Sequence, residues 1–181
     1  MFLKRPRQLL SCAVLGAGLL LSACGFQLRG TGVDNISLEE IRLTSNQLNN
    51  PTFDQLLAAL QNEGVRLTDG ADYHLQLIED RHEQVALSYT SRASAAEVEL
   101  RQHLTFRIMD TQGRVLIGPE TLSTQRVYIN DRDNIVGTGE EQELLRREMR
   151  GDMVRQMLFR LSALSESELS ARERALDQMR P

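Results

Sequence analysis

Alternation of apolar and polar residues is the strongest pattern in the chain. Between residues 98 and 108, apolar side chains at most even positions alternate with polar or charged side chains at odd positions. This two-residue period is typical of a half-buried strand with one face toward water. The same period occurs at 73–77 and returns at 85–89 with the same parity. The pattern predicts four strands, at about 38–43, 73–89, 98–108 and 114–129.

Two other stretches repeat apolar residues at helical spacing. The first helix is expected to begin at Asn50-Pro51 and to end at Gly64, because Asn caps helices, Pro suits the first turn and Gly suits the end. Its apolar stripe is Phe53, Leu56, Leu57 and Leu60. A second, long helix is expected from about Thr138, with an apolar stripe of Leu145, Met149, Met153, Val154, Met157, Leu158, Leu161 and Leu164. Residues 165–181 are charged and thinly apolar, which predicts a frayed tail, with a weak helix at about 169–179 as the alternative.

The order strand, helix, three strands, long helix predicts an α+β fold. Two amphipathic helices can bury their apolar stripes by covering one face of a sheet. We therefore expect a two-layer sandwich with two helices packed on one face of a four-stranded mixed sheet. The first strand–helix–strand step would be a right-handed crossover, and the last three strands an antiparallel meander. This single domain would span residues 24–164.

The first 24 residues have the layout of a bacterial secretory signal. Lys4, Arg5 and Arg7 precede an apolar stretch at 9–21, which is too short to span a membrane. The stretch ends in Leu-Ser-Ala-Cys, which resembles the lipobox of bacterial lipoproteins. Cleavage would then remove residues 1–23 and leave Cys24 to carry the lipid anchor. The alternative is a plain secretory signal followed by a chance cysteine.

Charge and motifs exclude several functional classes. Of the 21 cationic residues three lie in the signal, so the remaining 158 residues carry 18 cations, all Arg, against 25 acids. This acidic balance argues against nucleic-acid binding, which needs a basic face. The three histidines have no metal-ligand spacing, and Gly137-Thr138-Gly139 lacks the Lys of a phosphate loop. We therefore expect no catalytic residues, cofactor or metal, and no enzyme activity.

One polar segment suggests a ligand contact. Residues 88–96 connect two predicted strands with small residues around a single Arg92. Guanidinium groups bind phosphate or carboxylate through two parallel hydrogen bonds. Arg92 is thus a candidate for binding an anion, and a solvated loop arginine is the alternative.

The residues after the lipid site carry a family resemblance. Cys24-Gly25-Phe26-Gln27-Leu28-Arg29-Gly30 is similar to the opening of the LptE (RlpB) lipoproteins of lipopolysaccharide assembly, and the order of elements agrees. The resemblance implies two helices on a four-stranded sheet and no enzyme activity. It also implies a role as a plug inside the LptD β-barrel that assists barrel assembly and binds lipopolysaccharide.

The same resemblance suggests where ligand and membrane are bound. It favours Arg92 and, on the loop before the last helix, Arg132 as lipopolysaccharide-binding residues. Gly25 rather than Asp after the lipidated cysteine favours the outer membrane, with the body on the periplasmic side or within the barrel. The alternative function is a stand-alone periplasmic lipoprotein that serves as a transporter accessory or envelope scaffold.

Overall fold

The computed structural model describes residues 36–89, 95–131 and 134–179, all of which belong to one compact unit, Val33–Pro181. Cys24, Arg92 and Arg132 lie outside the described residues, as does the expected signal at 1–23. The elements follow one another as β1 (Glu40–Ser45), α2 (Pro51–Asn62), β2 (Arg66–Leu67), β3 (His74–Tyr89), β4 (Ala95–Met109), β5 (Val115–Ile129), α3 (Ile135–Ser162) and α4 (Glu166–Gln178).

The strands form one mixed sheet in the order β2-β1-β3-β4-β5. β1 runs parallel to both β2 and β3, whereas β3, β4 and β5 form an antiparallel meander of strands 15 or 16 residues long. The expected parallel first step and the expected meander are both confirmed. The sheet has five strands rather than four, because the two-residue β2 pairs with the outer edge of β1.

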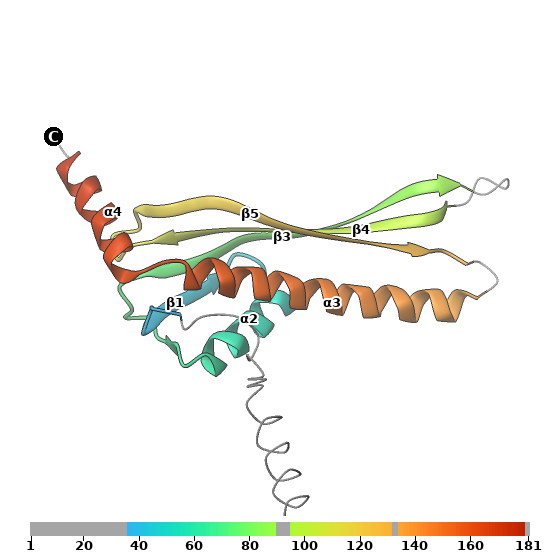
Figure 1. The fold of residues 1–181 in the computed structure, drawn as a ribbon, viewed down its shortest axis with the longest axis horizontal. Helices are drawn as coiled ribbons and strands as arrows, with labels where there is room; N and C mark the ends of the chain where they lie inside the picture. The colour runs from blue at the N-terminus through green and yellow to red at the C-terminus, as the bar shows by residue number, and fades with distance from the viewer. Residues whose placement is uncertain (1–35, 90–94, 132–133, 180–181) are drawn as a thin grey trace, which may run out of the picture. The chain divides into compact units, whose positions relative to one another are not determined.

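Helices α2 and α3 cover one face of this sheet (Figure 1). The Asn50 side chain caps α2 by accepting hydrogen bonds from the backbone N–H groups of Thr52 and Phe53, and α2 gives way to Gly64 at a positive φ of 84°. These helix ends confirm the sequence-based expectation, since Asn satisfies free N–H groups and Gly tolerates a left-handed backbone.

The main core lies between the two helices and the sheet. Leu104, Phe106 and Ile108 of β4 are fully buried against Met153, Met157 and Leu161 of α3 and Leu56 and Leu60 of α2. Leu57 was expected in this core but is only half-buried. Helix α2 is rotated about its axis so that Thr52, Leu56 and Leu60 face the core. The apolar stripe alone did not determine this rotation.

The sequence-based assignment of side chains to the two faces of β3 is wrong beyond Leu77, because β3 contains a β-bulge. The register shifts between Leu77 and Glu79, so Asp80 rather than Glu79 lies opposite Leu104 on the helix side. An extra residue in one strand inverts the side chains that follow it, here as far as Ala86, after which the register shifts again. Val85, which shares its parity with the buried Leu75, therefore lies opposite Glu99 on the open face of the sheet.

The C-terminal segment is also corrected. Residues expected to fray, or to form only a weak helix from about Leu169, form the ordered helix α4, whose Ser165 cap accepts a hydrogen bond from the backbone of Glu168. Leu169 is fully buried in the main core, and Arg114 in the β4–β5 turn pairs with Asp110 and Asp177. These contacts include an ion pair between residues 63 positions apart, and no local pattern reveals such long-range contacts.

Candidate functional site

The end of β3, the start of β4, the end of β5 and the start of α3 meet at one end of the sheet, which we call the distal end. Its described residues are 85–89 of β3, 96–99 of β4, 126–130 and 134–144. The pairing of Tyr89 with Ala95 and of Glu97 with Ile129 brings the ends of β3 and β5 beside the start of β4. Consequently, the described residues that flank both 90–94 and 132–133 lie at this end.

Exposed apolar side chains gather at the distal end. Among the described residues eleven large apolar side chains are exposed, and seven of them are here: Leu87, Tyr89, Val127, Ile129, Ile135, Val136 and Leu144. Ile135 and Val136 are each about three-quarters exposed. Contiguous exposed apolar residues are uncommon on soluble domains and mark binding surfaces. The distal end is therefore the best candidate for contact with an apolar ligand or partner.

Two hollows accompany these side chains. One lies on the outer side of the first turns of α3, where Ile135, Val136 and Leu144 are accompanied by Glu140, Glu143 and Arg147. The second lies between α3 and the sheet, and Ala86, Val98, Tyr128, Ile135 and Gln142 are among its lining residues. Both hollows combine an apolar surface with a few polar groups, which is the usual composition of a ligand site.

A small second core supports the distal end. Val98, Leu100, Tyr128 and Met149 are buried together, with Leu145 packed against them. The hydroxyl of Tyr128 accepts a hydrogen bond from Nε2 of Gln84 at 2.6 Å and donates to Oε1 of Gln142 at 3.5 Å. These bonds join β3, β5 and α3. The exposed apolar residues thus stand on a fixed scaffold.

A buried polar cluster separates the two cores. Nε2 of Gln102, a fully buried residue, donates to Oδ1 of Asp80 at 2.9 Å and to Oγ1 of Thr52 at 3.1 Å. His82 approaches the same Asp80 oxygen at 3.3 Å. Burial raises the pKa of Asp80, but hydrogen bonds from His82, Thr52 and Gln102 outweigh burial and hold that pKa below its usual value. Asp80 is therefore held as an anion that fixes α2 to the middle of the sheet.

Ion pairs fasten the helices to the sheet. Arg160 of α3 binds Glu120 of β5 through two hydrogen bonds of 2.8 Å, and Arg126 of β5 pairs with Asp152 of α3. Bidentate pairing with Arg160 lowers the pKa of Glu120. Among the residues that the structure describes, no group of three His, Cys, Asp or Glu side chains could hold a metal ion.

Sequence reasoning did not find the apolar distal end. The predicted ligand residues, Arg92 and Arg132, fall in the two segments outside the described residues, so their roles stay predictions. Tyr89 and Ile129, which border these segments, were assigned to ordinary strand faces. The available signal was that the alternating apolar residues of 85–89 continue to the end of the strand.

Several bacterial lipoproteins share this α+β sandwich. A minor lipoprotein from Acinetobacter baumannii is 27% identical, with a TM-score of 0.59 over 69% of this chain and 91% of its own. Rare lipoprotein B from Shewanella oneidensis has a TM-score of 0.56 at 24% identity over 76% and 98% of the two chains. Lipoprotein B from Nitrosomonas europaea has a TM-score of 0.66 at 21% identity over 81% and 96%. At such identities the last two show the fold alone.

The family follows from sequence comparison. Residues 33–161 match the model of the LptE lipopolysaccharide-assembly family. The LPS-assembly lipoprotein LptE of Photorhabdus laumondii is 27% identical over 170 residues, which cover 91% of this chain and 92% of that protein. The chain belongs to the LptE family, and the role of that family, lipopolysaccharide assembly, is non-enzymatic. No helix among the described residues is long and apolar enough to cross a membrane.

Proposed function

We propose that this protein is an outer-membrane lipoprotein that fills the lumen of the LptD β-barrel, assists assembly of that barrel and binds lipopolysaccharide on its way to the cell surface. The observation that carries the proposal is the match of residues 33–161 to the lipopolysaccharide-assembly family. Lipidation of Cys24 would attach the body to the membrane. Several acyl chains are needed for this, because one chain holds a protein only weakly.

The open face of the sheet supports a position inside a barrel. The lumen of a membrane β-barrel is polar, so a plug needs polar side chains outside and a dry core within. On the open face, Nδ1 of His103 lies 3.0 Å from Oγ of Ser123, and the hydroxyls of Thr105 and Thr121 lie 2.9 Å apart. These cross-strand pairs form a polar surface that can exchange hydrogen bonds with a lumen wall.

The distal end supports lipopolysaccharide binding. Lipopolysaccharide joins anionic phosphates to acyl chains, so its site needs cations beside apolar surface. Arg92 and Arg132 would bind the phosphates, and the exposed apolar residues, such as Ile129 and Ile135, would contact the acyl chains. Because the mature chain is acidic overall, binding must depend on these few local arginines rather than on net charge.

Co-purification tests the function. The full-length lipoprotein, carrying a C-terminal affinity tag, is extracted from membranes in mild detergent and purified, and its partners are identified by mass spectrometry. A stoichiometric complex with LptD is the expected result. Recovery of the lipoprotein alone, with LptD present in the same extract, would instead favour a stand-alone envelope scaffold. The same lipoprotein without its tag, taken through the same purification, serves as the control for non-specific recovery of membrane proteins.

A further inference from the structure

β3 carries a strand edge that the sheet leaves partly unpaired. β1 pairs with β3 only from His74 to Leu77, whereas β3 continues to Tyr89. No strand among the described residues lies beside the second half of this edge. An unpaired strand edge presents a row of N–H and C=O groups to which another chain can add.

At the start of this free edge, the side-chain amide of Gln47 binds the backbone of Asp80 as the peptide group of a neighbouring strand would. Oε1 of Gln47 accepts a hydrogen bond of 2.6 Å from the backbone N–H of Asp80, and Nε2 of Gln47 donates to the backbone carbonyl of Asp80 at 3.3 Å. A side-chain amide offers the same donor and acceptor as a backbone amide. The edge at Asp80 thus already binds an amide in the two-way manner of a neighbouring strand.

The following residues present the same groups in the same direction. Along a strand, the backbone groups of alternate residues point to the same side. His82, Gln84 and Ala86 therefore direct their N–H and C=O groups toward the side where Gln47 binds Asp80. Within the described part of the chain, no hydrogen bond reaches these backbone groups on that side.

At the opposite edge of the sheet, side chains bind backbone carbonyls of the edge strand β5. On β5, the carbonyl of Leu116 accepts a hydrogen bond from Arg172, that of Ser123 from Gln156 and that of Gln125 from Arg126. Side chains of α4, α3 and β5 itself thus occupy carbonyls along the β5 edge. The comparison singles out β3 beyond Asp80 as the edge that is open to a partner.

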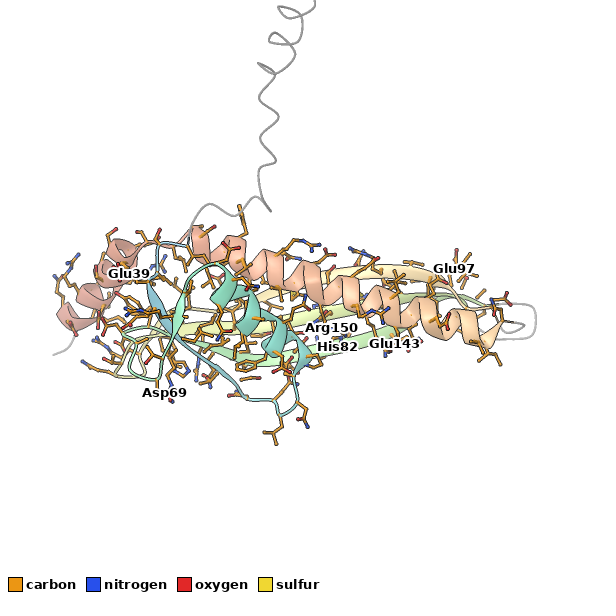
Figure 2. The ribbon with its side chains drawn as sticks, turned by 90° about the horizontal axis from the view of Figure 1, so that it is seen from below. Glu39, Asp69, His82, Glu97, Glu143 and Arg150 are labelled. Carbon is orange, nitrogen blue, oxygen red and sulfur yellow. The ribbon has the colours of Figure 1, made fainter. Side chains whose placement is uncertain are left out.

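The flank beside the open edge favours an acidic partner. A cavity of about 150 Å³ between β3, β4 and α3 has two arginines and one acid in its lining, which consists of His82, Glu83, Gln84, Leu100, Arg101, Arg146 and Met149. Figure 2 labels His82, Arg150 and Glu143 along this flank. Arg146 pairs with Glu143 at 3.1 Å, while Arg150 has no ion pair among the described residues.

We propose that residues 82–86 of β3 are a docking edge for an extended, acidic segment of a partner protein, which would add a further strand to the sheet. Backbone hydrogen bonds would supply the binding, as in other cases of strand addition. Carboxylates on the helix-facing side of the added strand would meet Arg146 and Arg150, and the alternate, apolar residues would lie on the open face of the sheet. The proposal does not depend on the proposed barrel or lipopolysaccharide contacts, although residues 85 and 86 of this edge also belong to the distal end.

Two synthetic peptides test the docking edge on the full-length lipoprotein in detergent. One acetylated nine-residue peptide alternates Val and Glu, and the other alternates Val and Lys. Hydrogen exchange of residues 80–89 is followed by mass spectrometry as each peptide is titrated. The Val/Glu peptide is expected to slow exchange in this segment and to bind at least about tenfold more tightly than the Val/Lys peptide, as one charge-assisted contact would give. Absence of protection, or equal affinity for both peptides, would overturn the proposal.

A proline substitution then tests the backbone contact itself. Gln84→Pro removes the outward N–H, and proline is tolerated on strand edges. Gln84→Ala is the matched control, because it also loses the bond to Tyr128 but keeps the N–H. The proline variant should bind the Val/Glu peptide at least about tenfold more weakly than the alanine variant. Equal binding by two variants of equal melting temperature would refute strand addition, and the charge comparison on the unaltered protein holds even if Gln84→Pro misfolds.

Discussion

Replacing Leu104 with Ala tests the central packing of the sheet against the helices. Leu104 is fully buried in the middle of β4, opposite Asp80 and Leu122, and belongs to the main core. The substitution removes three carbon groups, which corresponds to about 2.4 kcal/mol at about 0.8 kcal/mol per group. A cavity adds to this loss wherever neighbours cannot collapse, so we expect a total of about 3–5 kcal/mol.

Leu57→Ala provides a matched comparison, because it deletes the same atoms from a half-buried position on α2. Its expected cost is about 1 kcal/mol, as for an ordinary substitution away from the core. Urea unfolding of the purified protein, followed by circular dichroism, measures both changes. For a domain of this size each kcal/mol corresponds to about 2–4 °C in Tm, so Leu104→Ala should lower Tm by at least about 6 °C. Equal losses for the two variants would show that the helix-on-sheet packing described above is wrong.

Three further substitutions address the anchor, the ligand and an ion pair. Cys24→Ala should abolish labelling by radioactive fatty acid, and labelling equal to that of the unaltered protein would refute lipidation at Cys24. Arg92→Asp should weaken binding of purified lipopolysaccharide by at least about tenfold, with little effect on Tm. The loss of affinity should be smaller at high salt, because salt screens the charge. Unchanged affinity would show that Arg92 is a solvated loop residue. Glu120→Gln should lower stability at pH 7, because pairing with Arg160 depresses the pKa of Glu120 and so contributes stability above its unfolded pKa. This difference should vanish as the pH falls through the depressed pKa, and a difference that persists at pH 2 would exclude the ion pair as its cause.

Local patterns along the sequence determined most of the fold. The Asn50-Pro51 start and Gly64 end of α2 follow from backbone chemistry, and the alternation at 98–108 follows from one buried and one wet strand face. The family resemblance likewise depended on a short run of residues and was confirmed over 33–161. Each of these features is encoded within a few neighbouring residues, which is why the sequence sufficed to predict them.

Tertiary structure decided the features that depend on distant residues. The bulge after Leu77 inverts β3 from Glu79 to Ala86, and this register is set by pairing with β4 rather than by the parity of the β3 residues. α4 is stable because Leu169 is buried in the main core and Arg114 forms an ion pair with Asp177, which is 63 residues away in the sequence. The apolar distal end arises only when the ends of β3 and β5 and the start of α3 come together. Such contacts join residues that no window along the chain contains, so only the folded chain reveals them.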